Sequence, residues 1–115
     1  MKYLCLVHLD ESRIAAESKE VWSQVGKDSY EYDQSLMRSG HFVAAAALQA
    51  PNTAVIVRPK GNDFTTTDGP FIEVKEHVGG FILIEARDLN EAISLAAKIP
   101  VAQYGAVEVR PVMQF

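Results

Sequence analysis

Residues 77–86, HVGGFILIEA, decide the fold of this chain of 115 residues. After two glycines the stretch is rich in aromatic and β-branched residues, which predicts a β-strand. Side chains of a strand alternate between its two faces, so one face carries Phe81 and Leu83 and the other carries Ile82, Ile84 and Ala86. The strand is therefore apolar on both faces, and the sheet that contains it needs cover on both sides.

The rest of the chain supplies strands and helices around this one. Strands are expected over residues 2–8, 41–48 and 106–112, a hairpin over 53–58 and 63–67, and helices over 14–39 and 88–98. The long helix rests on apolar residues spaced by three and four, starts near Ser12 or Ser18, and ends at Gly40. A capping box formed by Asp88 and Glu91 begins the second helix.

The order of these elements is β-α-β-(hairpin)-β-α-β, which predicts a ferredoxin-like α+β fold in one domain, residues 1–115. In such a fold two helices cover one face of an antiparallel sheet. The other face would stay apolar here, whereas a one-sided sheet normally alternates apolar with polar residues. An exposed apolar face marks an interface. We therefore expect a homodimer that packs sheet against sheet as a dimeric α+β barrel, with a cavity between the sheets.

Composition excludes several classes of protein. The net charge of -4 comes from 15 acidic and 11 dispersed basic residues, which argues against a nucleic-acid partner. The longest apolar run, residues 42–48, has seven residues, too short to span a membrane. The apolar start of the chain has no signal-peptide cleavage site. A lone Cys5, placed in an apolar strand, predicts a buried thiol and a reducing, cytoplasmic location.

The stretch TTTDGPFIEVKEHVGG, residues 65–80, holds the main candidate site residues. In one interpretation Asp68 caps a turn shaped by Gly69 and Pro70, and Phe71 fills a core pocket. In the other, Asp68 lies at the mouth of the dimer cavity as a general base, and Lys75 holds an anionic substrate group. Lys75 fits a solvated surface cation equally well.

Further candidates for ligand binding are His8, Phe71, Glu108 and Arg110. Glu108 and Arg110 share one face of the last strand, either inside a ligand pocket or in water at the rim of the sheet. The histidines stand at strand ends, far apart in the sequence, where hydrogen bonding is favoured over a metal site. No metal or cofactor motif is present, so we expect neither.

The chain resembles the YCII-related superfamily, in the branch named after the motif Asp68-Gly69-Pro70-Phe71. The resemblance extends through Gly79-Gly80-Phe81 and Tyr104-Gly105 to Val107-Glu108-Val109-Arg110-Pro111-Val112, and covers essentially the whole chain. It implies a dimeric α+β barrel. It assigns no reaction, and it implies an association of some members with sigma factors.

Elsewhere in that superfamily a His/Asp pair is the proposed catalytic dyad, and this chain lacks both members. The Asp would directly precede the proline after the second helix, where this chain has Ile99-Pro100, and no His lies between Leu9 and Gly40. Three hypotheses follow. The chain binds a small, anionic or neutral molecule, with or without cofactor-free lyase or isomerase turnover by Asp68; it is a regulatory module acting with a sigma factor; or it is a structural dimer.

Overall fold

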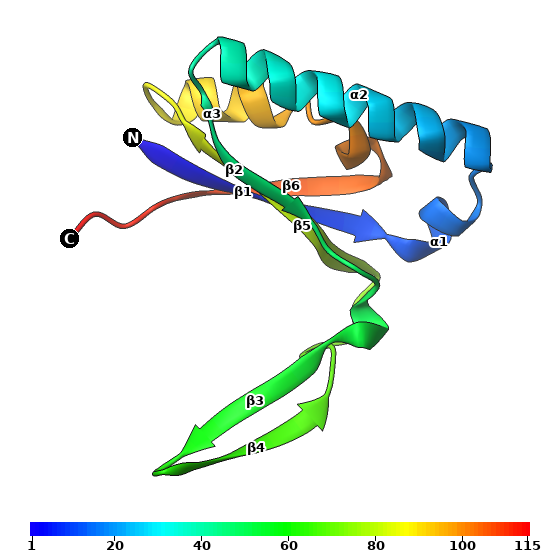
Figure 1. The fold of residues 1–115 in the computed structure, drawn as a ribbon, viewed down its shortest axis with the longest axis vertical. Coiled ribbons are helices and arrows are strands. Elements are labelled where there is room, and N and C mark those ends of the chain that lie inside the picture. Colours follow the sequence, from blue (N-terminus) through cyan, green and yellow to red (C-terminus); the bar gives the residue numbers. More distant parts are fainter.

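A computed structural model describes residues 1–115 as a mixed α+β fold (Figure 1). The strands are β1 (Lys2–Asp10), β2 (Phe42–Ala47), β3 (Val55–Lys60), β4 (Asp63–Asp68), β5 (Glu76–Glu85) and β6 (Gly105–Pro111). The helices are α1 (Glu11–Ala15), α2 (Lys19–Arg38) and α3 (Leu89–Ala96), with 3₁₀ helices η1 (Pro51–Thr53) and η2 (Pro100–Tyr104).

The main sheet has the order β2-β5-β1-β6, with every neighbouring pair antiparallel. Helices α2 and α3 cover one face of this sheet (Figure 1). The predicted β-α-β-(hairpin)-β-α-β order and the ferredoxin-like α+β class are both confirmed. The predicted central strand is β5, which pairs with β1 on one side and β2 on the other.

Capping side chains set where the helices begin and end. The predicted helix over 14–39 is two helices, because Asp10 caps α1 and Ser18 caps α2 separately. The Ser18 hydroxyl accepts a hydrogen bond from the Val21 amide at 3.2 Å, which satisfies one of the free amides of the first turn. Gly40 follows α2 with φ 81°, in the left-handed region predicted for it. Asp88 caps α3 through the Glu91 amide at 2.9 Å.

The hairpin differs from its prediction in length. Strands β3 and β4 extend through Lys60 and from Asp63, so the turn is Gly61-Asn62 and not the four residues 59–62. Gly61 has φ 60°, which a two-residue hairpin turn requires. The hairpin leaves the main sheet on the side opposite the helices (Figure 1), and none of its residues is buried.

The core lies between the sheet and the helices. Its buried members include Tyr3, Cys5 and Val7 of β1 and Ile82 and Ile84 of β5, which all point to the helix side. Cys5 is 1% exposed, as predicted. Burial raises the pKa of its thiol to about 11, so it is held as the thiol.

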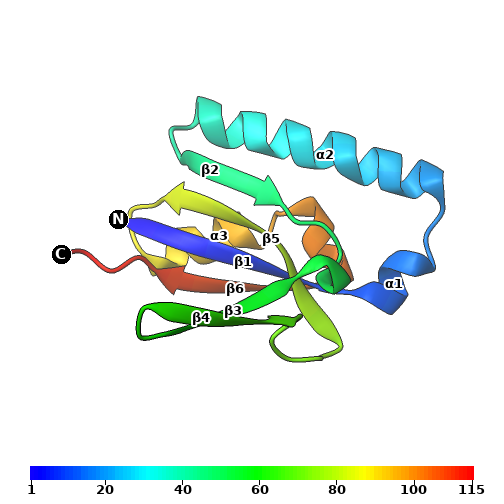
Figure 2. The same cartoon turned by 60° about the horizontal axis from the view of Figure 1, so that its bottom comes forward.

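The second face of the sheet is apolar and open. Leu4 pairs with Leu83 and Leu6 with Phe81 across β1 and β5, and all four are half-buried. The prediction that the strand at 77–86 is apolar on both faces is therefore confirmed. The radius of gyration is 16.0 Å, against about 13 Å for a compact chain of this length. The projecting hairpin, seen from another side in Figure 2, explains the difference.

Candidate functional site

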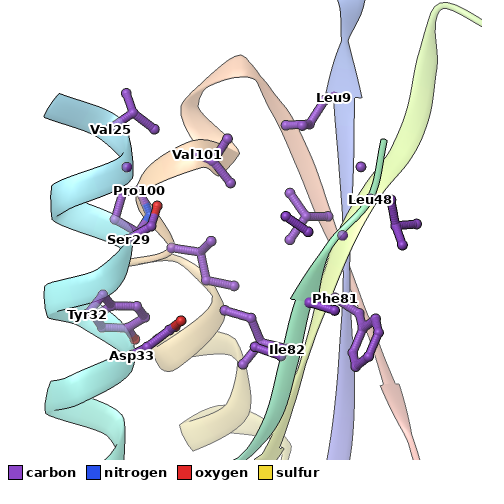
Figure 3. A pocket seen from close by; sticks show the side chains of 18 of the residues that line it. Leu9, Val25, Ser29, Tyr32, Asp33, Leu48, Phe81, Ile82, Pro100 and Val101 are labelled. Atoms are coloured by element: carbon purple, nitrogen blue, oxygen red, sulfur yellow. The ribbon is translucent and has the colours of Figure 1, made fainter. Parts of the chain in front are cut away.

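A cavity of about 520 Å³ lies between α2 and the main sheet (Figure 3). Nineteen residues line it, and 13 of them are hydrophobic. They come from α2, from β1, β2 and β5 of the sheet, from Leu48 just after β2, and from Ile99 and the first two residues of η2. The cavity is on the helix side of the sheet, not on the open face where a cavity between two sheets would lie.

The cavity exists because small residues face one another across the layers. Gly26 and Ser29 of α2 and the alanines 45–47 of β2 all line it. Of the 20 residues of α2, only Val25 and Leu36 are buried. Short side chains on both walls cannot fill the space between helix and sheet, so α2 stands away from β2 and β5. The signal in the sequence was the run of four alanines, residues 44–47, together with a glycine, Gly26, in the helix that faces it, and its meaning was not recognised from the sequence.

An aromatic side chain of α2, that of Trp22, forms part of the cavity wall and packs against Tyr104. Trp22, the single tryptophan of the chain, lines it, and its ring centroid lies 5.3 Å from that of the buried Tyr104. The indole Nε1 donates to the Ile14 carbonyl at 3.3 Å. Its polar atom is therefore bonded outside the cavity, and the ring contributes apolar surface.

Few polar groups reach the cavity. The Tyr32 hydroxyl donates to the Leu95 carbonyl at 2.6 Å, and burial raises the pKa of this phenol. Asp33 is the only charged residue among the lining residues, and burial raises the pKa of its carboxyl. Ser29 adds one hydroxyl. The wall thus combines a large apolar surface with one carboxyl, from Asp33, and two hydroxyls, of which that of Tyr32 is already bonded.

The predicted pair Asp68 and Lys75 does not line this cavity. Asp68 ends β4, exposed, and the turn after it is held by the backbone bond from Gly69 N to Ala54 O at 2.8 Å. The Asp68 carboxylate accepts no hydrogen bond in the chain, so the predicted capping role is not observed. The Nζ atom of Lys75 lies 3.6 Å from Oδ2 of Asp10, the cap of α1.

The prediction that Phe71 fills a core pocket is wrong. Its side chain is 66% exposed, and the Arg58 guanidinium lies 5.1 Å from the centre of its ring. The loop that carries Phe71 follows the projecting hairpin, so it is held away from the core that the sheet and helices form. The ring packs instead against the hairpin through a cation–π contact.

His8 and Glu108 are brought together on the open face of the sheet. Their side chains meet at 3.0 Å between Nε2 and Oε1, across β1 and β6. Glu108 and Arg110 share a face, as predicted, and both are exposed. The side chain that Glu108 contacts is that of His8, not that of Arg110. All three lie on the side of the sheet opposite the cavity.

Comparisons with known proteins identify the family of this chain. A model of the YCII-related domain matches residues 1–115. The chain belongs to the YCII-related family. It is also 34% identical, over 113 residues, to an uncharacterized protein of Rhizobium meliloti (strain 1021), R00369, and the match spans 96% of this chain and 91% of that protein.

Within the YCII-related fold, the position of the absent Asp can now be located. The resemblance places this Asp immediately before Pro100, at Ile99. Ile99 is 6% exposed, and it lines the cavity together with residues of α2. The departure at Ile99 therefore puts an apolar side chain in the cavity wall where the resemblance implies a carboxyl.

His41, the acidic groups and the helices of this YCII-related chain add no further site. The Nδ1 atom of His41 lies 2.8 Å from the Glu85 carbonyl oxygen, a structural hydrogen bond. No group of three or more His, Cys, Asp or Glu side chains is arranged to hold a metal ion. No helix has both the length and the apolar character needed to cross a membrane.

Proposed function

We propose that this YCII-related protein binds a small, largely apolar organic molecule in the cavity beneath α2. The observation that carries the proposal is the cavity itself: about 520 Å³, with 13 hydrophobic residues among 19. Sites for small organic ligands typically measure about 300–1,000 Å³ and combine apolar walls with a few polar groups. The match in size and in lining supports binding as the function.

The lining holds no nucleophile paired with a base, so it favours binding over covalent turnover. The Tyr32 hydroxyl is engaged by the Leu95 carbonyl, and Ser29 has no histidine beside it to act as a base, since none of the lining residues is a histidine. Asp68, one of the two candidates named from the sequence and there a possible base, is not in the wall. The wall also carries no lysine or arginine, so an anion would enter without a counter-charge, and a neutral or cationic ligand fits better.

Trp22 provides a direct test because it is the single tryptophan and lines the cavity. We expect N-phenyl-1-naphthylamine, a neutral apolar probe, to bind saturably and to quench Trp22 emission by energy transfer. Ser29→Leu extends an apolar side chain into the cavity and should weaken binding at least tenfold. Lys27→Leu, the same final residue at an exposed position outside the lining, is the matched control. Equal binding by both variants would refute the cavity as the site.

We also propose that two copies pair through the open face of the sheet. The half-buried Leu4, Leu6, Phe81 and Leu83 form a contiguous apolar surface, of the kind that marks an interface. The hairpin supports the same conclusion: Val55, Val57 and Phe64 are 60%, 56% and 61% exposed, and an isolated two-stranded hairpin is marginally stable in water. A second copy of the chain would cover both the open face of the sheet and the apolar side chains of the hairpin.

Light scattering after size-exclusion chromatography tests the pairing. The wild-type chain should have twice the mass of one 12.7 kDa chain, and Leu6→Asp should halve the measured mass. Met37→Asp, at a 47% exposed position on α2, should leave it unchanged. A monomeric wild type at micromolar concentration would overturn the pairing. The sigma-factor alternative stays a prediction, since no feature of the fold favours it.

A further inference from the structure

We infer that the ligand of the α2 cavity is an apolar amine, whose ammonium group is held by Asp33 and Ser29. This inference rests on the proposed function and names the chemical class that the cavity selects. The inference depends on where the polar groups of the cavity wall lie and on which of them already form hydrogen bonds within the chain.

Asp33 is a carboxylate without a counter-charge. It is half-buried, it is the only charged residue of the lining, and no lysine, arginine or histidine forms an ion pair with it. No donor of the chain hydrogen-bonds to its side chain. Figure 3 shows this side chain directed from α2 toward the cavity. A partly desolvated carboxylate in an apolar wall is costly unless a cation or a donor approaches it.

Ser29 stands one helical turn before Asp33 on the same side of α2. Residues four apart on a helix are neighbours on its surface, and Figure 3 shows both side chains turned toward the cavity. An ammonium group has three donors, so it can bond to the carboxylate and to the Ser29 hydroxyl together.

The other polar atoms of the wall are occupied. The Tyr32 hydroxyl bonds to the Leu95 carbonyl and the Trp22 indole N–H bonds to the Ile14 carbonyl. The remainder of the lining is apolar or backbone. A ligand with a second charged group would leave that group unpaired, and an anion would face Asp33. One amine on a hydrocarbon body is the class that satisfies every group.

A matched set of three probes tests the class: adamantan-1-amine, adamantan-1-ol and adamantane-1-carboxylate, measured by calorimetry and by Trp22 emission at pH 8. These probes share one hydrocarbon body and differ in the polar group. At pH 8 an alkyl amine is protonated and a carboxyl is ionised. We expect the wild type to bind the amine at least tenfold more tightly than the alcohol, and the carboxylate most weakly.

The variant Asp33→Asn should remove the preference for the amine and leave the affinity for the alcohol within twofold. Asp28→Asn is the matched control, because Asp28 lies on α2 outside the lining and bonds to Gln24 at 2.9 Å. It should leave all three affinities unchanged. The retained alcohol binding shows that the Asp33→Asn cavity is intact.

The outcomes separate this inference from the proposed function. If the alcohol binds as tightly as the amine, and Asp33→Asn changes neither, the class is wrong while the cavity remains a binding site. If Asp33→Asn also loses the alcohol, Asp33 maintains the cavity and does not select its ligand, which overturns the inference. If no probe binds, including N-phenyl-1-naphthylamine, the proposed function itself fails.

Discussion

Replacing glycine by alanine should change the stability of this protein in opposite directions at two positions, one inside α2 and one directly after it. Gly26 lies inside α2, and Gly40 follows it with φ 81°. A Cβ atom added at either position meets no atom within 4 Å. Space is therefore equal at the two sites, and only the backbone conformation differs.

At Gly26 alanine should stabilise the protein by about 1 kcal/mol, since glycine is the worse helix former by that amount. At Gly40 alanine should destabilise it by about 1–2 kcal/mol, because a Cβ is strained in the left-handed region. Unfolding entropy is about 2.1 cal/mol/K per residue, so the 115 residues give about 0.24 kcal/mol/K. Gly26→Ala should thus raise the Tm by about 4 °C, and Gly40→Ala should lower it by about 4–8 °C.

Urea and thermal unfolding, followed by circular dichroism at one protein concentration, measure both variants. The concentration is held constant because pairing of chains would itself change the Tm. A destabilised Gly26→Ala would show that the wall of α2 at Gly26 is packed and not open, which would remove one side of the cavity. A neutral Gly40→Ala would show that α2 does not end in the left-handed conformation at Gly40.

Three further predictions concern single groups. Cys5 should resist iodoacetamide at pH 8 in the folded protein and react quickly in urea, because burial raises the pKa of its thiol to about 11. The hydrogen bond from the Ser12 hydroxyl lowers the pKa of Asp10 from its usual value of 3.8. Asp10→Asn should therefore destabilise the protein at neutral pH. In urea titrations this loss of stability should disappear as the pH falls below about 3.8 and through the lower pKa that Asp10 has in the folded protein. Gly80→Ala should destabilise by about 1–3 kcal/mol in the same titration, since its Cβ would lie 2.8 Å from the Ala46 carbonyl oxygen.

The local structure of the chain could be predicted because its causes lie within a few residues. Ser18 and Asp88 cap helices with amides three residues on, and Gly40 ends a helix by its own conformational freedom. Side chains alternate between the two faces of a strand, and residues 81–84 are all apolar, so the sequence likewise predicts that both faces of β5 are apolar. These interactions act within one helical turn or one strand, so they can be predicted from the order of the residues.

The candidate site could not be predicted in the same way. The sequence directed attention to Asp68 and Lys75, which lie outside the cavity wall, and to Phe71, which is exposed. It also placed His8 and Glu108 among the candidates without showing that they meet at 3.0 Å, since 100 residues separate them. Contacts of that kind depend on the register of β1 against β6, which no local pattern encodes.

The order of the elements, the end of α2 at Gly40, the start of α3 at Asp88 and the two apolar faces of β5 could thus be predicted from the sequence alone, whereas the break between α1 and α2 could not. Only the tertiary structure decided that Gly26, Ser29 and the alanines of β2 face one another and leave a cavity with Asp33 in its wall. The physical reason is that hydrogen bonding and periodicity are short-range properties of the chain. A cavity is the volume left over when side chains from distant segments meet, and it exists only after they have been brought together.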